Sequence, residues 1–70
     1  MDDYQINRLA RVFSEAAQMH AVCAEIEGMK AENAHRLGCD LSIAYGDEAF
    51  TERATLLRSI SDNLSSIAQE

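Results

Sequence analysis

The sequence predicts an all-α fold: an antiparallel helical hairpin with unequal arms that assembles as a dimeric four-helix arrangement. Three observations lead to this prediction. The 70 residues include no proline and only three glycines, so the chain has few breaks and forms few, long elements. Apolar residues recur at alternating steps of three and four, as they do along one side of a helix. A short segment bounded by Gly38 and Gly46 separates two such patterns. Residues 1–70 are therefore expected to form a single helical domain.

The first helix is expected at about residues 3–37. Asp2 is a suitable N-cap, and Gln5 stands at the reciprocal capping-box position. Met1 and Ile6 fall where a hydrophobic staple would form. Gly28 disfavours a helix by about 1 kcal/mol relative to alanine, but its neighbours are helix formers, so the helix is expected to continue through it. The predicted apolar seam consists of Leu9, Val12, Ala16, Met19, Cys23, Ile26 and Leu37.

Gly38 is expected to end this helix in the left-handed conformation, with His35 and Arg36 in the last turn. Residues 38–46 then form the connection. The second helix is expected at about residues 47–68, capped by Gly46 or by Asp47. Its apolar set is Phe50, Leu57, Ile60, Leu64 and Ile67.

The unequal arms predict self-association. At ~1.5 Å per residue, the first helix is about 50 Å long and the second about 33 Å. A short connection makes the two helices antiparallel neighbours, so the second is expected to cover only residues 15–37 of the first. An apolar patch left bare usually marks an interface, and a twofold axis lets such a patch meet its own copy. The predicted dimer or partner interface consists of Ile6, Leu9, Val12, Phe13 and Ala16.

The connection is a second candidate surface for a protein partner. Leu41, Ile43 and Tyr45 give it an apolar content that is high for a loop. The alternative is that these side chains fold over the end of the hairpin as a plug.

Charge and composition restrict the function classes. Twelve acidic and six basic residues give a net charge of −6, which repels phosphate and disfavours nucleic acid as a partner. Arg8 and Arg11 keep a nucleic-acid-associated regulator as an alternative. No apolar run approaches the ~20 residues of a membrane span, and the acidic N-terminus is unlike a signal peptide. A cytoplasmic location is expected, where cysteines are reduced thiols.

Two histidines and two cysteines are a proper ligand set for zinc. They are His20, Cys23, His35 and Cys39. On a straight helix the two histidines stand about 22 Å apart, so one shared site would need the helix to break near Gly28. The zinc module remains an alternative, and the expectation is no metal and no cofactor. No group of residues combines a nucleophile, a base and an oxyanion hole, so a non-enzymatic protein is expected.

Two segments resemble small accessory proteins encoded in the early exo–xis region of lambdoid bacteriophages. They are residues 29–33 (MKAEN) and 43–50 (IAYGDEAF). The resemblance covers roughly residues 19–60, and its motifs are structural. It implies an early viral protein that modulates host or viral developmental processes in the bacterial cytoplasm, with no enzymatic activity. Cys23 and Cys39 have no counterpart in that pattern.

Overall fold

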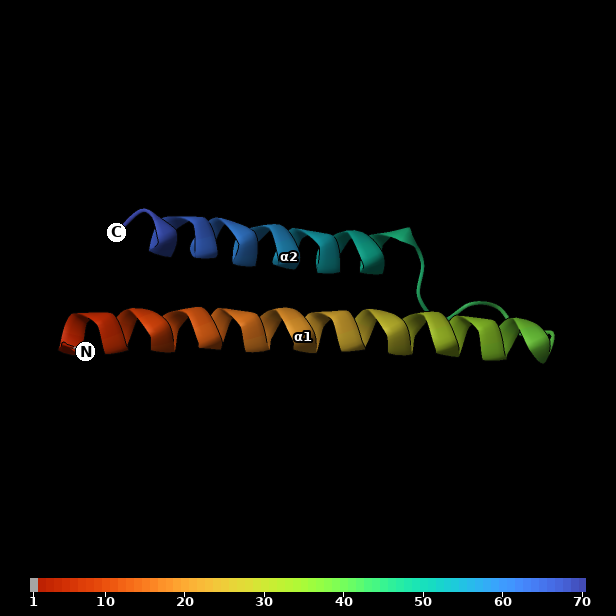
Figure 1. Cartoon of the computed structure of the whole chain (residues 1–70). Coiled ribbons are helices and arrows are strands. Elements are labelled where there is room, and N and C mark those ends of the chain that lie inside the picture. The colour runs from red at the N-terminus through yellow and green to blue at the C-terminus, as the bar shows by residue number, and fades with distance from the viewer. Residues whose placement is uncertain (1) are drawn as a thin grey trace.

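The computed structural model describes residues 2–70, which form two helices joined by a short connection. Helix α1 spans Asp3–Gly38 and helix α2 spans Asp47–Ala68. The helices run antiparallel and lie side by side, with both termini at the same end (Figure 1). This arrangement confirms the all-α helical hairpin and its unequal arms, 36 residues against 22.

The beginning of α1 agrees with the sequence. The amide of Gln5 donates to the Asp2 carboxylate at 2.8 Å, and the Asp2 amide donates to the Gln5 side chain at 3.4 Å. These two bonds are the predicted capping box, which satisfies backbone donors that have no partner inside the helix. The predicted staple involves Met1, which lies outside the described residues.

Helix α1 continues through Gly28 without a break, as expected. The prediction for its end was wrong, because Gly38 is still helical and no described glycine has a positive φ. The left-handed residue is Asp40, with φ of 65°. Leu41 donates its amide to the Arg36 carbonyl at 2.8 Å, and Asp40 donates to the Leu37 carbonyl at 3.2 Å. This pair of bonds is a Schellman motif, which aspartate accommodates because its short polar side chain tolerates the left-handed region.

Helix α2 begins with Gly46 as its N-cap, in an extended conformation and without a side-chain cap bond. Of the two predicted caps, Gly46 is the one used. Asp47 and Glu48 occupy the first turn, where their charges complement the helix dipole.

The helices meet along a heptad seam that differs from the predicted one. Val22 and Met29 of α1 and Ile60 and Ile67 of α2 are the residues buried in the described chain. Cys23, predicted in the seam, is exposed, as are Leu9 and Leu37. The α1 residues that are half-buried or buried against α2 recur every three or four positions. They are Arg8, Val12, Glu15, Met19, Val22, Ile26, Met29, Asn33 and Arg36.

The α2 side of the seam follows its prediction. Phe50, Leu57 and Leu64 are half-buried at steps of seven, and Ile60 and Ile67, three residues after Leu57 and Leu64, are buried. Arg53 also occupies this seam, and its Nε lies 3.2 Å from the Glu25 carboxylate. Its aliphatic stem covers apolar surface while the guanidinium reaches a charged partner.

The predicted overlap of the helices was wrong. Helix α2 reaches back as far as Arg8, whose Nε donates to the Ile67 carbonyl at 3.1 Å. The 14 residues by which α1 is longer (36 less 22) amount to about 21 Å, and this surplus lies mainly at the connection end. There the connection runs back along α1 before α2 begins (Figure 1). An extended chain rises about 3.3 Å per residue, so about six or seven extended residues span this distance.

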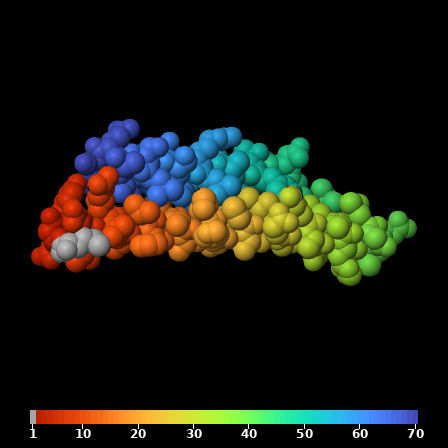
Figure 2. Space-filling view, in the orientation of Figure 1, coloured from red at the N-terminus to blue at the C-terminus, as the bar shows by residue number. Residues whose placement is uncertain are grey.

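The hairpin is a single layer. Its principal extents are 58 × 18 × 9 Å, and the space-filling view shows a narrow rod in which α2 covers one side of α1 (Figure 2). Folded domains usually pack two layers around a core. Here each helix has one neighbour, so the far side of α1 faces solvent.

Candidate interaction surface

The N-terminal half of α1 exposes large apolar side chains on the side away from the seam. Phe13 is 69% exposed, Ile6 53% and Leu9 43%. Ala16 lies beside them and is half-buried. These four residues are referred to below as the Phe13 face. They were predicted as an interface, and they are exposed although α2 covers this end of α1, because they lie on a different side of the helix.

Val12, the fifth predicted interface residue, belongs to the intrachain packing. It is half-buried and lines a groove between the two helices. Leu9 forms the rim where this groove meets the Phe13 face. The groove is lined by Gln5, Arg8, Leu9, Val12, Leu64, Ile67 and Ala68. Its lining is mostly apolar, so the Phe13 face and the groove form one continuous apolar surface.

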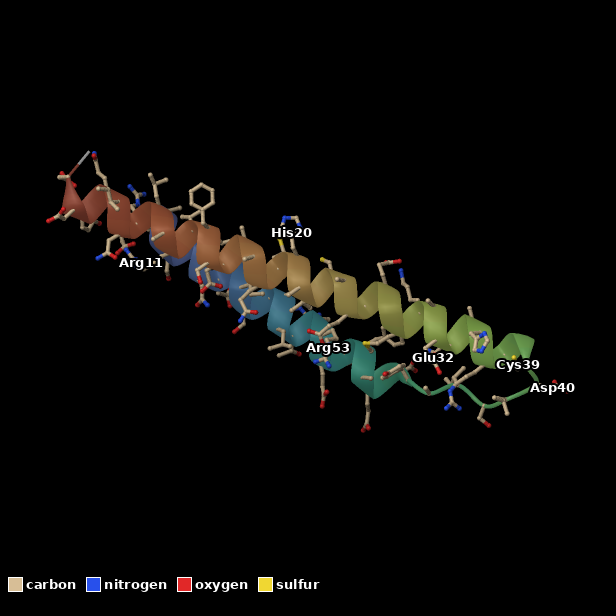
Figure 3. The ribbon with its side chains drawn as sticks, turned by 90° about the horizontal axis from the view of Figure 1, so that it is seen from below. Arg11, His20, Glu32, Cys39, Asp40 and Arg53 are labelled. Carbon is tan, nitrogen blue, oxygen red and sulfur yellow. The ribbon has the colours of Figure 1, made fainter. Side chains whose placement is uncertain are left out.

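The opposite edge of the hairpin is polar. Asn63 of α2 donates to the Glu15 carboxylate at 3.2 Å. Gln18, Glu25 and Ser59 line a hollow on the same edge, together with the exposed Leu56. Figure 3 places Arg53 at this edge and His20 at the other. The two edges therefore differ in chemistry, which gives the hairpin one apolar edge and one polar edge.

Arg8 and Arg11 are engaged at the C-terminus of α2. Arg8 donates to the carbonyls of Ile67 and Ala68, at 3.1 and 3.3 Å. Carbonyls in the last turn have no partner inside the helix, and a cation there complements the dipole. Arg11 donates to both carboxylate oxygens of Glu70, at 2.7 and 2.6 Å, and this bond raises the pKa of the guanidinium above its usual value. Both arginines thus have a structural role that the sequence did not reveal.

The connection is held to α1 by Asn33. Its Oδ1 accepts from the amides of Ala44 and Tyr45, at 3.0 and 2.9 Å, and its Nδ2 donates to the Tyr45 carbonyl at 2.8 Å. Sequence reasoning missed this residue. Asparagine is a weak helix former because its side chain competes for backbone groups, and its place among strong helix formers was the available signal.

Leu41, Ile43 and Tyr45 remain exposed along the connection, so the plug interpretation was wrong. The reason is that the connection lies along the side of α1 instead of closing the end of the hairpin. The exposed side chains leave the candidate partner loop in place as a prediction.

The four potential zinc ligands are not brought together. Helix α1 is continuous between His20 and His35, and Figure 3 shows His20 near the middle of α1 and Cys39 at its end. Cys23 and Cys39 are exposed free thiols, which corrects the interpretation of Cys23 as a core residue. Within residues 2–70, no three histidine, cysteine or acidic side chains form a group that could hold a metal ion.

Neither α1 nor α2 is long and apolar enough to cross a membrane, over the residues that the structure describes.

The fold and its surface define an all-α two-helix hairpin with one exposed apolar edge. Comparisons with family models, curated proteins and solved structures give no match to this chain. The resemblance to early exo–xis proteins therefore stays a prediction.

Proposed function

We propose that this chain is a non-enzymatic protein that acts by binding protein through the Phe13 face. One observation carries the proposal: a phenylalanine that is 69% exposed stands among Ile6, Leu9 and Ala16 on a regular helix. A contiguous apolar patch on a helix is a common recognition surface for a second helix. The adjoining groove extends that surface onto α2.

The size of the exposed surface supports the same proposal. The accessible surface is 5262 Å², whereas a folded monomer of 7.7 kDa is expected to expose about 4300 Å². The excess of about 960 Å² is comparable to the ~800 Å² that each partner contributes to an interface of standard size. Protein binding would bring the chain to the exposure expected for its mass.

The biological setting follows from the resemblance alone. Under the proposal, the chain is an early phage accessory protein that modulates host or viral development in the host cytoplasm by occupying a protein surface. Binding of nucleic acid through Arg8 and Arg11 is disfavoured, because both guanidinium groups already bind the C-terminus of α2.

The test compares Phe13→Asp with Leu56→Asp. Both replace an exposed apolar residue by aspartate, but Leu56 lies on the polar edge. The mass in solution and the set of proteins retained from a bacterial lysate are measured for each variant. We expect Phe13→Asp to abolish association with any protein, including the chain itself, and Leu56→Asp to preserve it. An unchanged mass and an unchanged set of retained proteins for Phe13→Asp would overturn the proposal.

A further inference from the structure

We infer that the occupant of this surface is a second copy of the chain, with the two α1 helices packed antiparallel about a twofold axis that passes between His20 and Ala21. The inference rests on the proposed function and names its partner. It places the two α1 helices at the centre and the two α2 helices outside. Three features of α1 carry it: the size of the side chains on its solvent-facing side, their spacing, and the charges at the two ends of the helix.

The large apolar residues on the solvent-facing side of α1 lie in its N-terminal half. Its N-terminal half carries Ile6 and Phe13, both exposed. Its C-terminal half carries Gly28, where an added Cβ would meet nothing within 4 Å, followed by the exposed Ala31. Antiparallel pairing places the large apolar side chains of one helix against the half of the other helix that carries Gly28 and Ala31. Parallel pairing would place Phe13 against its own copy and leave a gap at Gly28, contrary to the close packing of protein interfaces.

The spacing of small residues fixes the register. Alanine recurs at intervals of seven on this side, and all four positions are exposed: Ala10, Ala17, Ala24 and Ala31. Side chains this small let two helix backbones approach closely. The centre of the alanine series lies between His20 and Ala21, so Ala17 pairs with Ala24 and Ala10 with Ala31 across the axis. Phe13 and Gly28 are equally distant from the same centre. The register that aligns the alanines therefore also places each Phe13 over the Gly28 of the other copy.

The charges at the ends of α1 favour the same orientation. Asp3 lies in the first turn, and His35 and Arg36 lie in the last turn. Antiparallel pairing brings the acidic end of one helix to the basic end of the other, and the two helix dipoles oppose each other. Parallel pairing would bring like charges together at both ends.

Cysteine cross-linking tests the register in the full chain. Cys23 and Cys39 are exposed and are first replaced by serine. Ala17→Cys and Ala24→Cys are then made as separate single-cysteine proteins, mixed, refolded together and oxidised. A disulfide needs Cα atoms within about 7 Å, and in the inferred register two copies of residue 17 are offset by about 10 Å along the axis.

We expect the disulfide between residues 17 and 24 to form in a larger proportion than random pairing of the two proteins would give. Mass spectrometry quantifies the three possible disulfides. Ser59→Cys on the polar edge is the control and should give few cross-links at the same concentration. Predominance of 17–17 and 24–24 disulfides would overturn the antiparallel register.

A size exchange tests the contact between Phe13 and Gly28. Gly28→Phe should weaken dimerisation by at least ~10-fold, because two phenylalanines then collide at each of two equivalent places. Adding Phe13→Ala to this variant exchanges the large and small positions and should restore dimerisation to within ~3-fold of the starting protein. Gly28→Ala is the control for the glycine itself, since alanine is small enough to fit. Circular dichroism confirms that each variant is helical.

Sedimentation equilibrium gives the mass for each variant, and the unmodified chain is expected at twice 7.7 kDa. Failure of Phe13→Ala to rescue Gly28→Phe would overturn the inferred contact. If the chain is a monomer while Phe13→Asp still abolishes capture of another protein, the proposed function stands and the second copy is refuted. If Phe13→Asp changes neither readout, both are refuted.

Discussion

The two sides of α1 carry similar helical spacing but different side chains. The side facing α2 presents medium and large residues along its whole length, with Val22 and Met29 buried. The solvent side presents alanines at intervals of seven along its length, with Ile6 and Phe13 in one half and Gly28 in the other. The first side is completed by a different helix of the same chain. The second side carries its large apolar residues in one half only, so it would match a second α1 helix that runs antiparallel to it. The spacing of apolar residues alone therefore does not reveal which partner a helix face selects.

Truncation of the buried side should have the largest effect. Ile60→Ala removes a buried side chain from the α1–α2 seam and should lower the free energy of unfolding by about 2–3 kcal/mol, as cavity-forming substitutions do. Chemical denaturation followed by circular dichroism measures it. The loss should be similar at every protein concentration, because the contact lies within one chain.

The matched substitution on the other side is Phe13→Ala. Phe13 is mostly exposed within the single chain. Its truncation should therefore lower the free energy of unfolding only at protein concentrations at which the chain associates. The effect should shrink as the protein is diluted, by mass action. A concentration-independent loss of the size seen for Ile60→Ala would contradict the difference drawn between the two sides.

An intermediate loss in the free energy of unfolding is expected for Asn33, which attaches the connection to the α2-facing side of α1. Asn33→Ala removes the acceptor of two backbone amides and the donor to the Tyr45 carbonyl. A loss of about 1 kcal/mol is expected, typical of hydrogen bonds near solvent. Hydrogen exchange at Ala44 and Tyr45 should accelerate. Asn33→Asp keeps the acceptor and should preserve their protection, so equal acceleration in both variants would refute the role of Oδ1.

The smallest effect is expected at the glycine of the solvent side. Gly28→Ala should raise the free energy of unfolding by at most about 1 kcal/mol, because alanine is the better helix former and the added Cβ meets open space. Thermal unfolding measures the gain. A loss of stability at low protein concentration would show that Gly28 has a role within the single chain.

Much of the secondary structure could be predicted from the sequence because its signals are local. The capping box of Asp2 and Gln5, the continuity of α1 and the start of α2 at Gly46 or Asp47 depend on residues a few positions apart. The end of α1 was misplaced because Gly38 is the common left-handed residue, whereas Asp40 was selected by the path of the chain that follows. That path depends on Asn33, which is distant from the loop in sequence.

The sequence by itself determined that the protein is a hairpin of two amphipathic helices, that its arms are unequal and that Ile6, Leu9 and Phe13 are apolar positions at one end. Only the tertiary structure decided which apolar stripe of α1 faces α2 and where the surplus length of α1 lies. The physical reason is that α1 is apolar over more than one side, so several rotations about its axis bury similar area. The choice among them is made by the fit to α2, by Arg8 at the end of α2 and by Asn33 in the connection.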